Sequence, residues 1–194
     1  METKTEVTAD AYIIAGKKYA RVTAIVRHAG LSDFSGIPEK DREYYFSRGT
    51  NNHRLWQDVE EGKDHLYDYD PEVEEYRAAH AKFLRETGFK ALSGGIELQV
   101  KSDDLKVAGT LDRLGTIQNR VVLIDYKTTQ VHPATAIQTA LYLLCIPGYK
   151  FSEVERYGVA FRNNGTYAMS PRYKDSDKDD AIYYAAKYHK ENPQ

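Results

Sequence analysis

The sequence has little cysteine, no long apolar run and almost no net charge, and each shortage excludes a class of protein. Its one cysteine, Cys145, excludes disulfides within the chain and cysteine-ligated zinc or iron–sulfur clusters. No segment approaches the roughly 18 apolar residues of a membrane span, and the first ten residues are polar, so we expect a cytoplasmic protein with no membrane partner. With 27 basic and 29 acidic residues, overall charge does not favour nucleic acid, although a local basic groove remains open.

The hydrophobic pattern predicts one domain of mixed helices and strands over 1–194, with flexible residues over 1–10 and a C-terminal helix within 174–194. Gly30 closes a short helix over 20–30, and a helical region over 39–60 is expected to break near Gly49. The remaining elements are expected to be a helix over 71–87, strands over 95–102, 105–115 and 120–128, a helix over 133–144, a hairpin over 156–170 and a helix over 177–189. An antiparallel meander that continues through a helical crossover, with helices on both sides, predicts an α/β (α+β) fold with a central mixed sheet.

Charged residues interrupt the most apolar hairpin of the chain, within the segment "GTLDRLGTIQNRVVLIDYKTT". A two-residue loop at 118–119 places Asp112 opposite Asp125, and Lys127 falls on the same face two residues later. Carboxylates directly opposite one another, with Cβ atoms roughly 4.5–5.5 Å apart, repel unless positive charge lies between them. The lysine neutralises only part of that charge, so the pattern indicates a bound cation.

The preceding hairpin supplies a further carboxylate. A two-residue loop at 103–104 pairs Glu97 with Thr110, on the same face as Asp112 and diagonal to it. Magnesium and manganese prefer oxygen ligands, so this group of side chains predicts a divalent metal site. A slip of one residue in either register would turn its carboxylate to the other face.

Four short motifs then follow one another in a recognisable order between residues 49 and 142. They are "GTNNH" with Gly49 and His53, "GTLD" with Gly109 and Asp112, "IDYK" with Asp125 and Lys127, and "QTALY" with Gln138 and Tyr142. In this order they resemble the RecB-like branch of the PD-(D/E)XK nuclease superfamily. The resemblance implies a restriction-endonuclease-like core.

The resemblance also implies a role for each matching residue in Mg²⁺- or Mn²⁺-dependent cleavage of DNA. One or two ions would be held by His53, Asp112, Asp125 and the backbone carbonyl of Tyr126. The catalytic residues would be Asp112, Asp125, Glu97 and Lys127, of which Lys127 would orient the attacking water and neutralise charge on the phosphate. Gln138 and Tyr142 would position the DNA strand.

DNA contacts are expected from local basic patches. The candidates are Arg48 and Arg54 beside the histidine, Arg113, and Arg156 and Arg162 in a later strand. Tyr44, Tyr45 and Phe46 either stack on unpaired bases or pack a helix against the core, and packing is the commoner role of such residues.

The sequence departs from some members of this branch: it lacks the cysteines of an iron–sulfur cluster and the G-x-x-x-x-G-K-[ST] motif of a fused motor. We therefore expect a stand-alone exonuclease of the phage or mobile-element type, acting in recombination in the cytoplasm of a bacterial host. Its partners would be DNA and an annealing protein, and an oligomer is left open. The alternatives are a non-catalytic DNA-binding or interaction module on the same scaffold, and a non-nuclease hydrolase. The complete set of ligands and the lysine favour the nuclease.

Overall fold

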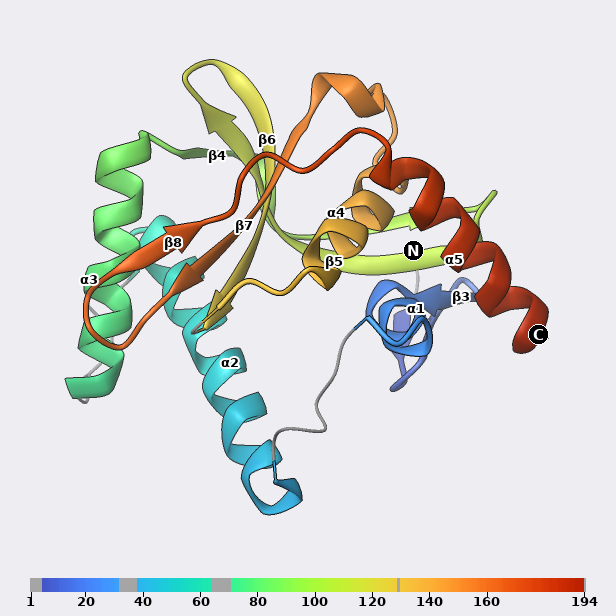
Figure 1. The fold of residues 1–194 in the computed structure, drawn as a ribbon, viewed down its shortest axis with the longest axis horizontal. Coiled ribbons are helices and arrows are strands. Elements are labelled where there is room, and N and C mark those ends of the chain that lie inside the picture. The colour runs from blue at the N-terminus through green and yellow to red at the C-terminus, as the bar shows by residue number, and fades with distance from the viewer. Residues whose placement is uncertain (1–4, 32–37, 64–70, 129, 194) are drawn as a thin grey trace.

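The computed structural model describes residues 5–31, 38–63, 71–128 and 130–193 (Figure 1). The helices are α1 (Val22–His28), α2 (Glu39–Glu60), α3 (Pro71–Thr87), α4 (Ala134–Leu144) and α5 (Asp177–Glu191), with a short 3-10 turn at Phe151–Glu153. The strands are β1 (Thr5–Val7), β2 (Ala11–Ile14), β3 (Lys17–Arg21), β4 (Lys90–Ser102), β5 (Val107–Ile117), β6 (Arg120–Thr128), β7 (Glu155–Phe161) and β8 (Tyr167–Met169).

These strands form one mixed sheet, which confirms the predicted fold class. The order is β1-β2-β3-β5-β6-β7-β8, and β4 pairs with β5 outside this path. Strand β3 runs parallel to β5 and β6 runs parallel to β7, while the other pairs are antiparallel. Helix α4 is the crossover that the parallel pair of β6 and β7 requires.

Helices cover both faces of the sheet, because its central strands carry apolar side chains on both faces. Leu123 of β6 packs in one core cluster with residues of α1, α4 and α5. Ile124 and Tyr126 of the same strand pack in a second cluster with Leu55, Trp56 and residues of α3. Figure 1 shows α2 and α3 on one side of the sheet and α4 and α5 on the other. Within the part of the chain that the structure describes, no helix is both long and apolar enough to cross a membrane.

The helix ends agree with the sequence patterns, with one exception. Gly30 and Gly88 follow α1 and α3 with φ of 70° and 66°, conformations that glycine adopts without strain. The predicted break at Gly49 is wrong, because α2 continues through it. A glycine inside a helix lowers stability by only about 1 kcal/mol. The burial of Leu55 and Trp56 in the C-terminal half of α2 offsets this cost.

The N-terminal segment is more regular than expected. Residues 5–7 lie in the stretch predicted to be flexible, yet they form β1 and pair with β2 from Thr5 opposite Ile14 to Val7 opposite Tyr12. Residues 8–10 connect β1 to β2, and the Thr8 N–H donates to the backbone oxygen of Ala11 at 2.8 Å; residues 1–4 lie outside the described residues.

One of the two predicted registers is confirmed and the other is corrected. Ile117 pairs with Arg120, as the loop at 118–119 predicts. Ser102 pairs with Val107 because the turn spans 103–106 and not only 103–104.

Asp103 stabilises this longer turn by accepting hydrogen bonds from Tyr19 Oη at 2.6 Å and Lys101 Nζ at 2.7 Å. The resulting shift of two residues keeps Glu97 on the predicted face and brings it into line with Asp112, between the pairs Leu98–Leu111 and Ile96–Arg113.

Candidate functional site

Strands β3 and β6 both pair with the same edge of β5, and the candidate site lies where these two strands diverge. Strand β5 pairs with β3 through Val107 and Ala108, and with β6 from Arg113 onward. At the point of divergence, the backbone N–H of Tyr126 donates a 2.6 Å hydrogen bond to Asp112 Oδ2. The carboxylate of Asp112 therefore joins β5 to β6 where the pairing of these strands ends, and the sheet fixes its position.

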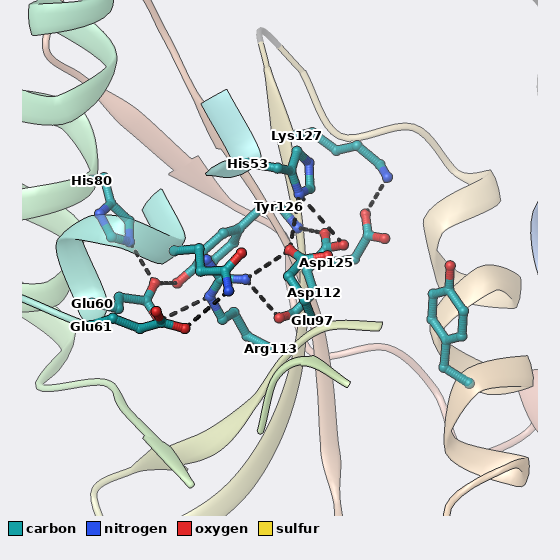
Figure 2. Close-up of polar contacts among 12 residues, drawn as sticks. His53, Glu60, Glu61, His80, Glu97, Asp112, Arg113, Asp125, Tyr126 and Lys127 are labelled. Atoms are coloured by element: carbon teal, nitrogen blue, oxygen red, sulfur yellow. Dashed lines mark hydrogen bonds and ion pairs between the residues drawn. The ribbon is translucent and has the colours of Figure 1, made fainter. Parts of the chain in front are cut away.

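Two side chains from different elements converge beside this carboxylate (Figure 2). His53 Nδ1 of α2 lies 3.6 Å from Asp112 Oδ1 and 3.6 Å from Glu97 Oε1 of β4. One potential ligand atom from each residue lies within 4.8 Å of the other two. Imidazole nitrogen and carboxylate oxygen at this spacing suit a divalent cation.

The protonation of His53 is consistent with this reading. Burial disfavours the charged imidazole, but Asp112 and Glu97 outweigh that effect and raise the pKa of His53. The site therefore attracts positive charge, from either a proton or a metal ion.

A buried carboxylate and a lysine lie next to this cluster. Asp125 is 1% exposed, and Lys127 Nζ forms an ion pair with its Oδ2 at 2.5 Å. Burial, together with the nearby charge of Asp112, raises the pKa of Asp125 to about 6. No hydrogen bond satisfies Asp125 Oδ1 among the described residues. A buried carboxylate oxygen without a donor is costly, so the donor set fits a bound cation.

Helix α4 supplies the next contacts of the lysine. Lys127 Nζ donates to Gln138 Oε1 at 3.4 Å, and Gln138 Nε2 donates to Tyr142 Oη at 3.3 Å. The ring of Tyr142 packs directly on Gly109, where a Cβ atom would lie 2.5 Å from it. Glycine at position 109 therefore lets α4 approach the sheet closely enough for this chain of contacts.

The family comparison agrees with this geometry. The family model of the PD-(D/E)XK nuclease superfamily matches residues 25–165, well over half of the chain. The chain belongs to the PD-(D/E)XK nuclease superfamily. No curated protein is similar enough to count as a match. Enzymes of this superfamily use divalent metal ions, in agreement with the cluster of His53, Glu97 and Asp112.

The PD-(D/E)XK motifs of the chain meet in space, with one difference from the predicted ligand set. Glu97, and not Asp125, completes the three-residue cluster with His53 and Asp112. Asp125 instead pairs with Lys127 on β6. Direct coordination by Asp125 and by the Tyr126 carbonyl stays a prediction.

A second group of charged residues behind this PD-(D/E)XK site was not predicted from the sequence. Arg113 Nε donates to Glu60 Oε2 at 2.9 Å, and Glu60 Oε1 lies 2.8 Å from His80 Nε2 and 3.2 Å from Tyr126 Oη. The one available signal was the spacing of His53 and Glu60, seven residues apart and so on the same face of a helix. His80 carries no such signal.

Two of the arginines proposed to contact DNA are buried, and these predictions are corrected. Arg113 is 0% exposed and Arg156 is 1% exposed, and both have protein partners. A guanidinium in the core cannot reach a phosphate. Arg162 is exposed.

The basic residues beside the histidine are better placed for DNA. The side chain of Arg54 is 75% exposed and lies 4.0 Å from Asp58. Arg48 is half-buried, and its guanidinium lies 5.6 Å from the ring centre of Tyr44, which is exposed. The predicted stacking by Tyr45 and Phe46 concerns side chains outside the described ones.

Proposed function

We propose that this protein is a metal-dependent deoxyribonuclease of the RecB-like branch that acts as an exonuclease. The observation that carries the proposal is the cluster of His53, Glu97 and Asp112 beside the buried Asp125–Lys127 pair. Both parts lie where the pairing of β5 with β6 ends, and they combine the donor types of a hard cation with an ammonium group. The proposal extends to DNA recombination in the cytoplasm of a phage-infected bacterial cell, with an annealing protein as partner.

The metal-binding residues would be His53, Glu97 and Asp112, joined by Asp125 and the carbonyl of Tyr126. The ion, Mg²⁺ or Mn²⁺, would lower the pKa of a bound water and withdraw charge from the phosphate.

The protein's own residues supply orientation and charge. Asp112 is held by the Tyr126 N–H, so its free oxygen faces His53 without rearrangement. Burial disfavours the Lys127 ammonium, but Asp125 and Asp112 outweigh it and raise the pKa of Lys127. Lys127 is therefore charged at neutral pH, and its ammonium donates to a phosphate oxygen or to the attacking water.

Residues around the centre would hold the DNA strand. Gln138 lies between Lys127 and Tyr142, so its amide reaches a phosphate close to the ammonium. The N-terminal half of α2 extends beyond the sheet and carries Arg48, with Arg54 one helical turn or more further along (Figure 1). A projecting helix with basic side chains next to the metal cluster is better suited to bind the end of a DNA strand than the middle of a duplex.

The deciding test is digestion of end-labelled linear duplex, circular duplex and single-stranded DNA with Mg²⁺, with Mn²⁺ and with EDTA. Asp125→Ala and Lys127→Ala are each expected to lower the cleavage rate by about 100-fold or more. Asp179→Ala and Lys178→Ala on α5 are matched controls, because both residues are exposed and lie outside the site.

Metal-dependent cutting that both site variants lose would establish the nuclease, and sparing of circles would make it an exonuclease. If folded wild-type protein leaves all three substrates intact with either metal, the proposal fails. Binding of DNA without cleavage would then favour the non-catalytic module.

A further inference from the structure

Glu97 has an unusual backbone for a metal ligand on a strand. Its φ is 47°, in the left-handed region that side chains other than glycine avoid. It follows an irregularity in the ladder between Ala91 and Ile96, where β4 bulges away from β5. Such conformations persist where the surroundings hold them, and here the bulge directs the Glu97 carboxylate toward His53.

The side chain that holds this carboxylate is Arg113. Arg113 Nη1 donates to Glu97 Oε1 at 3.1 Å and to the backbone oxygen of Asp112 at 2.7 Å. Both acceptors belong to residues of the metal cluster. The same Glu97 Oε1 therefore lies between the guanidinium on one side and His53 Nδ1 on the other.

Arg113 is itself fixed from behind (Figure 2). Its Nε is bound to Glu60, whose side chain is 6% exposed and contacts both His80 and Tyr126. Its guanidinium carbon lies 4.8 Å from the centre of the Tyr126 ring. The planar group is therefore held by one carboxylate and one aromatic face while it binds a second carboxylate.

We propose that Arg113 is a positioning residue that sets the Glu97 carboxylate in place, so that the cluster of His53, Glu97 and Asp112 is assembled before the metal binds. The proposal rests on the proposed function, because it takes this cluster as the metal site. The positive charge also offsets the repulsion between Glu97 and Asp112 while no ion separates them.

The geometry distinguishes positioning from simple neutralisation of a buried charge. Glu60 alone would neutralise Arg113, and it is the more buried of the two carboxylates. The Glu97 carboxylate is 31% exposed, so water solvates it and it needs no protein partner to be stable. A lysine at position 113 has one ammonium group and cannot bind Glu60 and Glu97 in the same fork-like manner. Arg113→Lys therefore separates charge from geometry.

The test measures Mn²⁺ binding without DNA, by calorimetry and by the fluorescence of Trp56. Trp56 is the one tryptophan of the chain, and its ring lies 5.3 Å from that of His53, so Mn²⁺ at the cluster should quench it. The variants are Arg113→Lys, Glu97→Gln and the double variant. Arg120→Lys is the matched control, since Arg120 forms an exposed ion pair with Glu155 on the same sheet.

Arg113→Lys is expected to weaken Mn²⁺ binding by about 10–100-fold, as loss of an outer partner of a metal ligand typically does. In the Glu97→Gln background the same change should have no further effect, because Arg113 acts through Glu97. Arg120→Lys should bind Mn²⁺ as the wild type does.

Wild-type affinity in Arg113→Lys would overturn the inference, and so would an equal loss with and without Glu97. Failure of the wild type to bind Mn²⁺ would instead remove the proposed function on which the inference rests. If Arg113→Lys does not fold, Glu60→Gln replaces it, with an expected loss of about 10-fold. Unchanged affinity in that variant overturns the inference as well.

Discussion

Among the residues that the structure describes, two arginines are buried almost completely, and they differ in what they bind. Arg113 binds two carboxylates, Glu60 and Glu97, of which the second belongs to the metal cluster. Arg156 binds one carboxylate, Asp177, and otherwise donates to the backbone oxygens of Ala136 and Lys174 at 2.7 and 2.6 Å and to Thr139 Oγ1 at 3.2 Å.

These partners give the two residues different effects on the molecule. Arg156 joins β7 to α4 and to the start of α5, so it stabilises the fold. Arg113 joins side chains whose placement decides the shape of the site. The environments also differ electrostatically: burial lowers the pKa of Arg156, whereas Glu60 and Asp112 outweigh burial and raise the pKa of Arg113. Burial alone therefore does not separate a structural arginine from one that serves the site.

The largest expected effect is on stability, at Arg156. Arg156→Met should lower the free energy of unfolding by about 3–5 kcal/mol, because it leaves the Asp177 carboxylate and two carbonyls without their donor. Urea unfolding measures this, with Arg172→Met in an exposed ion pair as the control. Mn²⁺ affinity of the folded variant should match the wild type, and a loss comparable to that of Arg113→Lys would erase the distinction.

A smaller loss is expected at the acidic partner of Arg156. Asp177→Asn should lower the free energy of unfolding by about 1.5–3 kcal/mol, the range for a hydrogen bond to a charged group. Asp179→Asn, two residues along α5 and exposed, should stay within about 0.5 kcal/mol of the wild type. Equal stabilities of the two variants in urea would show that the Arg156–Asp177 pair does not hold α5.

The pH dependence of metal binding is expected to distinguish Arg113, which contacts the metal cluster, from Arg156, which does not. The pKa of His53 is raised and that of Asp125 is raised to about 6, so both groups keep protons to higher pH and must release them to bind a cation. Each of the two groups should lower the Mn²⁺ affinity by about 10-fold per pH unit below its own pKa.

Calorimetric titrations between pH 5.5 and 8 measure this dependence. Arg113→Lys should move the midpoint to lower pH, because a Glu97 carboxylate that is no longer held beside His53 raises the pKa of His53 less. Arg156→Met should leave the midpoint unchanged. A midpoint that moves equally in both variants would contradict the separate roles.

The smallest expected effect is on Cys145, at the end of α4. Burial raises the pKa of its thiol to about 12, so native protein should react only slowly with a thiol reagent at pH 8. Arg156→Met should speed the reaction by loosening α4, and Arg113→Lys should not. Faster modification in Arg113→Lys would show that Arg113 also holds the α4 side of the sheet.

The sequence predicted the elements that depend on local pattern. Alternation along β6 and the loop at 118–119 were sufficient to place Asp112, Asp125 and Lys127 near one another on β5 and β6. The register of β4 was wrong by two residues, because the contacts of Asp103 with Tyr19 and Lys101 lengthen the turn and are tertiary. The face of Glu97 was right, because a shift of two preserves it.

The buried network could not be predicted for a similar reason. Arg113 and Arg156 look like surface residues in sequence, since arginine is rarely buried. Their burial depends on Glu60 and Asp177, which are 53 and 21 residues away along the chain. No local pattern links such partners, so both arginines were assigned to DNA.

The hydrogen bond from the Tyr126 N–H to Asp112 also affects how this scaffold can change during evolution. Loss of Asp112 would remove a proposed metal ligand and a strand contact together, so selection for a folded protein opposes it even where cleavage no longer matters. Lys127 is 28% exposed and is not bonded into the backbone in this way. A descendant that no longer cleaves DNA but still binds it would therefore be expected to lose Lys127 first and to retain Asp112 for its role in the fold.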